Sequence, residues 1–144
     1  MATVLRVLLA VVVGLVVGSV VNMALIMVSG KVIAPPPGAD VTTVEGLKAS
    51  LHLFEPRHFI FPFLAHALGT VVGACVAALL APRKSAVAAY IVGGLFLLGG
   101  IANVVMLPAP AWFSTTDLLF AYIPAAWLGL FLKERIQRRP SSGT

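Results

Sequence analysis

Charged residues are scarce in this chain. Lys, Arg, Asp and Glu make up 10% of its 144 residues, whereas hydrophobic residues make up 60%. A soluble domain carries about 25% charged residues, so this composition excludes an ordinary soluble domain and is typical of a membrane protein. The formal net charge of +5 would suit nucleic acid, but the basic residues stand at the ends of apolar segments, as topology signals do. We therefore expect a single integral membrane domain over residues 1–144 and no nucleic-acid partner.

Several chemical features are also missing from the sequence. Cys75 is the single cysteine, so no disulfide can form within the chain. No phosphate-binding loop, nucleophile elbow or Ser-His-Asp arrangement is present. His66 is the one ionisable side chain that we place inside the membrane, with no carboxylate beside it. This pattern disfavours a proton pump or a proton-coupled transporter that uses acidic carriers.

Four apolar segments are long enough to cross a bilayer, whose core of about 30 Å requires about 20 helical residues. They cover about residues 4–28, 59–81, 86–107 and 115–132. Arg6, Arg83 with Lys84, and the basic tail from Lys133 to Arg139 would all lie on one side. The positive-inside rule assigns that side to the cytoplasm. The prediction is an all-α membrane protein, a four-helix bundle in the plasma membrane (the bacterial inner membrane), with both termini cytoplasmic.

The long connection after the first span carries a pattern of its own, over about residues 42–55. Thr42 and Glu45 have the spacing of a capping box. Apolar residues then recur at helical intervals at Val44, Leu47, Leu51 and Phe54. This pattern predicts a short amphipathic helix in the outer interface, ended by Pro56.

A short motif occurs twice inside the apolar segments. Gly18-Ser19 precedes Asn22 in the first span, and Gly99-Gly100 precedes Asn103 in the third, 81 residues later. The second and fourth spans match more loosely. Because both halves would start in the cytoplasm, the motif predicts two duplicated helical hairpins related by a parallel pseudo-two-fold axis.

Small residues recur at intervals that let helix backbones approach closely. We expect such packing at Gly14, Gly18, Gly69, Gly73, Gly99 and Gly100. Stripes of this GxxxG kind drive helix association in membranes, where no hydrophobic effect operates between helices. Packing within the chain is the simpler interpretation, and a homodimer or a contact with a membrane-protein partner is the second.

Polar side chains fall at similar depth in the outer half of the predicted bundle, since an α-helix rises about 1.5 Å per residue. They are Asn22, His66, Thr70, Asn103 and Tyr122. Polar groups that faced lipid would lack hydrogen-bond partners, so we expect these side chains to face the interior. They either hold helices together through hydrogen bonds or line a polar pocket that opens outward.

A metal site is an alternative. His52, Glu55, His58 and His66 offer nitrogen and oxygen ligands of the kind that zinc or copper binds. Pro56 lies among them and disfavours one shared helical face. We therefore predict no cofactor, with a metal ion at these residues as the alternative.

Near the last span, Ser114 and Asp117 have the spacing of a helix start, and Trp112 suits an aromatic belt. The segments His66-Ala67-Leu68-Gly69-Thr70 and Met106 to Phe113 resemble segments of small, uncharacterised four-span proteins of the bacterial inner membrane. The resemblance implies the same membrane fold and supplies no chemistry.

Three function classes remain open. The first is a small, non-catalytic polytopic membrane protein that contacts lipid and partners, with an outward-facing pocket for a small polar or amphiphilic ligand. The second is a metal-dependent membrane enzyme with an outward-facing His and Glu site. The third is a structural accessory subunit of a membrane complex.

Overall fold

The computed structural model describes residues 2–138, and this part of the chain folds into helices without strands. Four helical stretches are long and apolar enough to cross a membrane: Ala2–Val32, Pro56–Leu80, Pro82–Met106 and Ala111–Gln137. The predicted all-helical class and the four candidate spans are thus confirmed. Arg139, the last residue of the predicted basic tail, lies outside the described residues.

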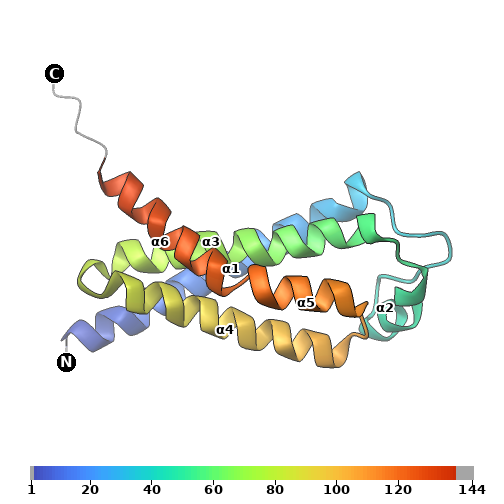
Figure 1. Cartoon of the computed structure of the whole chain (residues 1–144), viewed down its shortest axis with the longest axis horizontal. Helices are drawn as coiled ribbons and strands as arrows, with labels where there is room; N and C mark the ends of the chain where they lie inside the picture. Colours follow the sequence, from blue (N-terminus) through green and yellow to red (C-terminus); the bar gives the residue numbers. More distant parts are fainter. Residues whose placement is uncertain (1, 139–144) are drawn as a thin grey trace, which may run out of the picture.

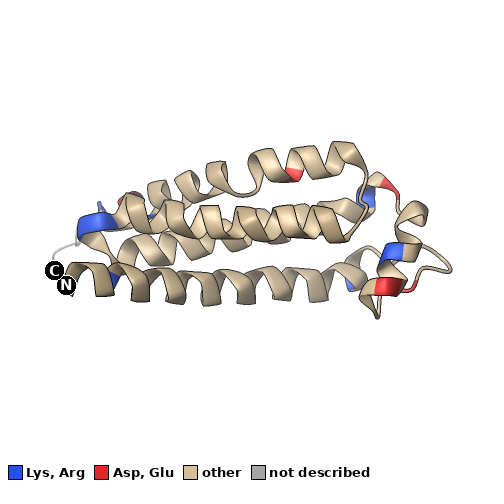
Figure 2. Ribbon diagram, turned by 90° about the horizontal axis from the view of Figure 1, so that it is seen from below, with Lys and Arg blue, Asp and Glu red and all other residues tan. Residues whose placement is uncertain are grey.

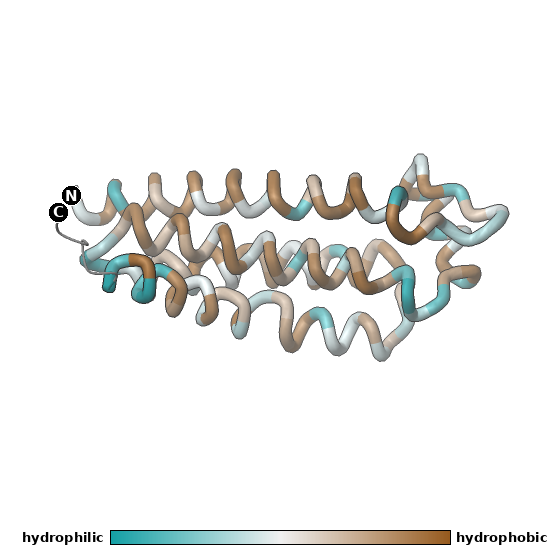
Figure 3. Tube along the Cα trace, turned by 90° about the horizontal axis from the view of Figure 1, so that it is seen from above, coloured by the Kyte–Doolittle hydropathy of each residue, from teal (hydrophilic) through white to brown (hydrophobic). Residues whose placement is uncertain are grey.

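The long helices form an elongated bundle (Figure 1). It contains α1 (Ala2–Val32), α3 (Ile60–Leu80), α4 (Ser85–Met106) and the shorter α5 (Ala111–Phe120) and α6 (Ile123–Gln137). The start of α1, the end of α6 and the turn η3 (Pro82–Lys84) lie at the same end of the bundle, where basic residues lie (Figures 1 and 2). Hydrophobic residues fill the length between the two ends (Figure 3).

The opposite end is covered by α2 (Val44–Ser50), η1 (Leu51–Leu53) and η2 (Pro56–Phe59) (Figure 1). The single helix predicted for about residues 42–55 is therefore divided. The predicted cap at Thr42 is also wrong, because Thr43 accepts the hydrogen bond from the Gly46 amide at 2.9 Å. Thr42 instead donates its hydroxyl and amide protons to Asp40.

Helix α3 lies at the centre, with α1, α4 and α6 packed around it. A Cβ atom built on Gly14 would lie 2.5 Å from the Gly73 carbonyl oxygen, and one on Gly18 would lie 2.6 Å from the Gly69 carbonyl oxygen. The α1 and α3 backbones are therefore in direct contact at positions where only glycine fits. Alanine fills much of the neighbouring core, including Ala10, Ala74, Ala77, Ala88 and Ala126.

The two glycines of the second motif behave differently from each other. A Cβ atom on Gly100 would collide with the Tyr122 ring, whereas one on Gly99 would meet no atom within 4 Å. Gly100 therefore permits a close contact with Tyr122, and Gly99 makes no close contact with the residues that the structure describes. The duplication of a helical hairpin stays a prediction.

The fourth span differs from its predicted bounds. It begins at Ala111 and is broken into α5 and α6 at Ala121 and Tyr122. Pro124 explains the break, because its ring has no N–H to bond with the fourth residue before it and clashes with that carbonyl. The earlier start places Asp117 in the body of α5 and not at a helix start.

Candidate ligand-binding site

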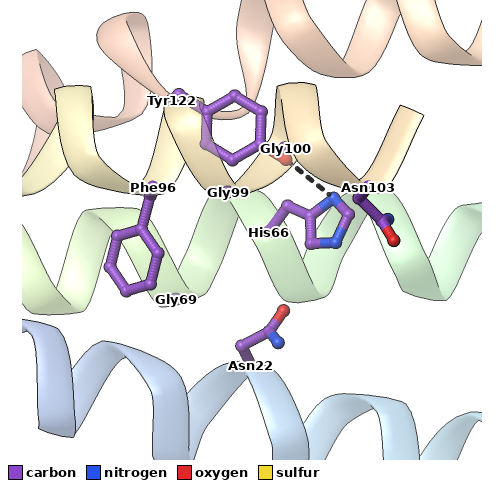
Figure 4. A pocket seen from close by; sticks show the side chains of 8 residues that line it. All are labelled: Asn22, His66, Gly69, Phe96, Gly99, Gly100, Asn103 and Tyr122. Atoms are coloured by element: carbon purple, nitrogen blue, oxygen red, sulfur yellow. Dashed lines mark hydrogen bonds between the residues drawn. The ribbon is translucent and has the colours of Figure 1, made fainter. Parts of the chain in front are cut away.

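Three side chains meet inside the bundle. His66 Nδ1 lies 2.9 Å from Asp117 Oδ1 and 3.0 Å from Oδ2, and the Tyr122 hydroxyl donates to Asp117 Oδ2 at 2.8 Å. The same hydroxyl lies 3.1 Å from His66 Nδ1 (Figure 4). Helix α3 supplies His66, α5 supplies Asp117, and the break between α5 and α6 supplies Tyr122. These contacts define a buried cluster, the His66–Asp117–Tyr122 cluster.

The cluster corrects one prediction. Asp117 is only 2% exposed and lies within a candidate span, so the interior does contain a carboxylate. The error came from reading Asp117 as part of a helix start. One signal in the sequence could have found it, because Phe113 lies one turn earlier and positions four apart share a helix face. Both side chains are buried on that face.

An ionised Asp117 and a neutral His66 allow one consistent arrangement of protons in these hydrogen bonds. An ionised Asp117 only accepts, so Tyr122 donates its hydroxyl proton and His66 donates the proton on Nδ1. The Nε2 atom of a neutral His66 is then an acceptor. It makes no hydrogen bond to any described residue. The cluster thus presents a base at Nε2, oriented by a carboxylate on the other ring nitrogen.

A polar cavity of about 290 Å³ adjoins the cluster (Figure 4). Four of the five predicted pocket residues line it, namely Asn22, His66, Asn103 and Tyr122. The rest of the wall comes from Gly69, Phe96, Gly99 and Gly100. Thr70 lies outside the wall, since it is 1% exposed and donates its hydroxyl proton to the His66 carbonyl at 2.8 Å.

The cavity lies where α1 and α4 separate. A Cβ atom on Gly18 would lie 2.9 Å from the Phe96 ring, so the two helices are in contact at that level and Phe96 closes one end. Gly99 and Asn103, further along α4, are exposed. The cavity therefore reaches the protein surface along the side of the bundle, between α1 and α4.

Asn22 contributes an unsatisfied polar atom. Its Oδ1 is buried and has no hydrogen-bond partner among the described residues. Figure 4 shows this oxygen directed towards the His66 ring. Gly69 permits the arrangement, because a Cβ atom at that position would lie 3.1 Å from the Asn22 Cβ. A buried carbonyl without a donor costs about 1–3 kcal/mol, which a ligand donor would recover.

A second, apolar cavity of about 170 Å³ lies between the bundle and the helices that cover its end. His66 and Asn103 line both cavities. Apolar side chains dominate the rest of its wall, among them Leu47, Leu51, Phe54, Phe59, Leu107 and Phe113. His58 also lines it, and the buried Nε2 of His58 has no hydrogen-bond partner among the described residues.

The four predicted metal ligands are dispersed. His52 Nδ1 lies 2.8 Å from the Ala49 carbonyl oxygen, and Glu55 pairs with Arg57 at 3.0 Å. His58 Nδ1 accepts from the Glu55 amide, and His66 is bound to Asp117. Within residues 2–138, no three His, Cys, Asp or Glu side chains gather as a metal ion would require. The metal alternative therefore has no assembled ligand set in the described part of the chain.

The cluster and the two cavities bring together residues of α1, α3, α4 and α5 and of the α5–α6 break. Comparison with known proteins finds no family model, no curated protein and no solved structure that matches this chain.

Proposed function

We propose that this chain is a small, non-catalytic membrane protein that holds a small amphiphilic ligand. One observation carries the proposal: a polar and an apolar cavity adjoin each other and share His66 and Asn103. An amphiphile has the same two-part character, and binding sites typically pair an apolar lining with a few convergent polar groups. Its polar head would occupy the cavity beside Asn22, and its chain the cavity beneath α2 and η2.

The surroundings of the cavities support access from the membrane. The polar cavity reaches the surface between α1 and α4, along the side of helices that are apolar enough to cross a bilayer. The basic residues Arg6, Arg83 and Lys84 line one depression at the opposite end of the bundle. In the orientation given by the positive-inside rule, that end is cytoplasmic and the cavities lie in the outer leaflet of the bacterial inner membrane.

The proposal includes a duplicated hairpin and association with a further helix. The matched residues Asn22 and Asn103 line one cavity from α1 and α4, as a pseudo-two-fold relation would place them. A Cβ atom built on Gly94 of α4 would meet no described atom within 4 Å, so this position offers a second copy or a membrane-protein partner room for a close contact.

A cavity-filling variant tests the binding function. A leucine at Gly99 would occupy the polar cavity, whereas a leucine at Gly94 would project from the same helix outside it. Native mass spectrometry of the protein in nanodiscs made from the host lipids would detect bound amphiphiles. We expect a bound species with the unaltered protein and with Gly94→Leu, and a loss of about tenfold or more with Gly99→Leu. The proposal fails if the unaltered protein carries no bound amphiphile, or if Gly99→Leu retains it.

A further inference from the structure

The polar cavity has an excess of hydrogen-bond acceptors. Asp117 already accepts protons from His66 and Tyr122. Two acceptors near it, Asn22 Oδ1 and His66 Nε2, then have no donor among the described residues. Polar atoms buried in a membrane protein require partners, because lipid supplies none. A ligand that fits this cavity therefore brings donors.

The charge of the site points to a cation. Asp117 is 2% exposed, and neither Lys nor Arg is among the described residues that line the two cavities. With His66 neutral, the His66–Asp117–Tyr122 cluster carries one net negative charge. A buried charge without compensation costs several kcal/mol. A positive charge in the polar cavity would offset that cost.

The aromatic residues that line the polar cavity are also suited to a bound cation. The aromatic side chains of Phe96 and Tyr122 both line the polar cavity (Figure 4). A cation within about 6 Å of an aromatic ring face is attracted by the ring quadrupole, more strongly where water is excluded. The cavity thus offers acceptors and aromatic surface, while the Asp117 carboxylate lines the adjoining apolar cavity and bonds to His66 and Tyr122 of the polar cavity's wall.

We infer that the polar cavity binds the protonated primary amine of an amphiphile, with the alkyl chain lying in the apolar cavity. This inference rests on the proposed binding function and names its ligand class. The ammonium has three N–H donors, enough for Asn22 Oδ1 and His66 Nε2 together. A quaternary ammonium has the charge without the donors, and a carboxylate has neither the right charge nor any donor.

A photolabelling series tests the ligand class on the full chain in phosphatidylcholine nanodiscs. The probes are dodecylamine, dodecyltrimethylammonium and dodecanoate, each with a diazirine in its chain. Label is counted on residues of the two cavities relative to the exposed outer face of α1. We expect dodecylamine to exceed each of the other probes by about tenfold or more. Equal labelling by dodecylamine and the quaternary probe overturns the inference.

Two variants that each replace a carboxylate by an amide test whether the Asp117 charge is needed for amine binding. Asp117→Asn removes the negative charge at nearly constant shape, and Glu134→Gln makes the same change on α6 at a residue that lines neither cavity. Asp117→Asn should reduce dodecylamine labelling about tenfold, and Glu134→Gln should leave it unchanged. If Asp117→Asn does not fold, the order of the three probes on the unaltered protein still decides.

The remaining outcomes separate the two proposals. Preferred labelling by dodecanoate would refute the amine and keep the amphiphile-binding function, whereas no labelling of the cavities by any probe would refute both. Nanodiscs that contain phosphatidylethanolamine distinguish the sources of the amine. Loss of dodecylamine labelling in them identifies the lipid headgroup as the ligand, and unchanged labelling identifies a free amine.

Discussion

His66 Nδ1 lies 2.9 Å from Asp117 Oδ1, although 51 positions separate the two residues in the sequence. This pair joins α3 to α5, and both side chains are largely withdrawn from solvent, at 18% and 3% exposed. Charged groups inside a membrane bundle are costly and are usually retained for function. The pair therefore connects the stability of the bundle to the chemistry of the polar cavity.

Removing one member of this pair should destabilise the protein more than removing both. His66→Leu leaves Asp117 buried with Tyr122 as its remaining donor, and the loss of a hydrogen bond to a charged group costs about 1.5–3 kcal/mol. In the double variant His66→Leu with Asp117→Leu, neither polar group of the pair remains buried without its partner, so the loss should be smaller than the sum of the single losses. Unfolding in detergent, followed by circular dichroism, measures these differences.

The exposed pair of Glu55 and Arg57 provides the control. Its side chains are 62% and 64% exposed, so Arg57→Leu should change the free energy of unfolding by less than about 1 kcal/mol. Additive losses at His66 and Asp117 would contradict the coupling that the structure shows.

The contact between α1 and α3 should not accept side chains larger than hydrogen. A Cβ atom on Gly14 would lie 2.5 Å from the Gly73 carbonyl oxygen, so Gly14→Leu forces the two backbones apart. We expect a loss of at least about 1–3 kcal/mol in the free energy of unfolding, as for overpacked cores. Gly94→Leu adds the same atoms where no neighbour lies within 4 Å and should change stability by less than about 0.5 kcal/mol. Equal losses of stability in Gly14→Leu and Gly94→Leu would contradict a close contact of the α1 and α3 backbones at Gly14.

The loop before α2 should lose local order in acid. The Thr42 hydroxyl and amide donate to Asp40 and hold the pKa of this carboxyl below its ordinary value of 3.8. A carboxyl with a lowered folded-state pKa contributes stability above its unfolded-state pKa, and this contribution is lost as the pH falls through the folded-state value. Exchange of the Thr42 amide hydrogen should therefore gain an extra acceleration below pH 3.8, relative to the amides of α2. Asp40→Ala should abolish this extra acceleration of Thr42 amide exchange.

The spans could be predicted from sequence because each depends on a local property. An apolar run of sufficient length predicts a membrane-spanning helix, whichever helices it packs against in the folded protein. The depth of Asn22, His66 and Asn103 follows from counting residues along those helices, and the structure indeed places these side chains around one cavity. No contact between helices is needed for either conclusion.

The cluster could not be predicted in the same way. The sequence predicts a helix start at Asp117, because the apolar run of the fourth span begins near residue 115. In the structure, the helix begins at Ala111, directly after Pro110, so Asp117 lies in the body of α5 on its buried face. Its contact with His66 then depends on how α5 packs beside α3, a tertiary relation that no local pattern encodes. The position of Tyr122 depends further on the break that Pro124 introduces.

The break at Ala121 and Tyr122 yields the last prediction. An alanine at position 124 restores an N–H that can donate to the carbonyl of Phe120, so the helix should continue through the break. Tyr122 then turns away from Asp117 and the hydrogen bond of 2.8 Å between them is lost. Hydrogen bonds to charged groups contribute about 1.5–3 kcal/mol, so Pro124→Ala should destabilise the bundle although alanine favours a helix.

Pro62 supplies the matched control. It lies in the first turn of α3, where the N–H of any residue has no partner within the helix, so Pro62→Ala should be nearly neutral. Fluorine NMR of a fluorotyrosine at position 122 reports whether the ring leaves its buried site. An unchanged Tyr122 resonance in Pro124→Ala would show that packing of Tyr122 against Gly100, and not the proline, imposes the break.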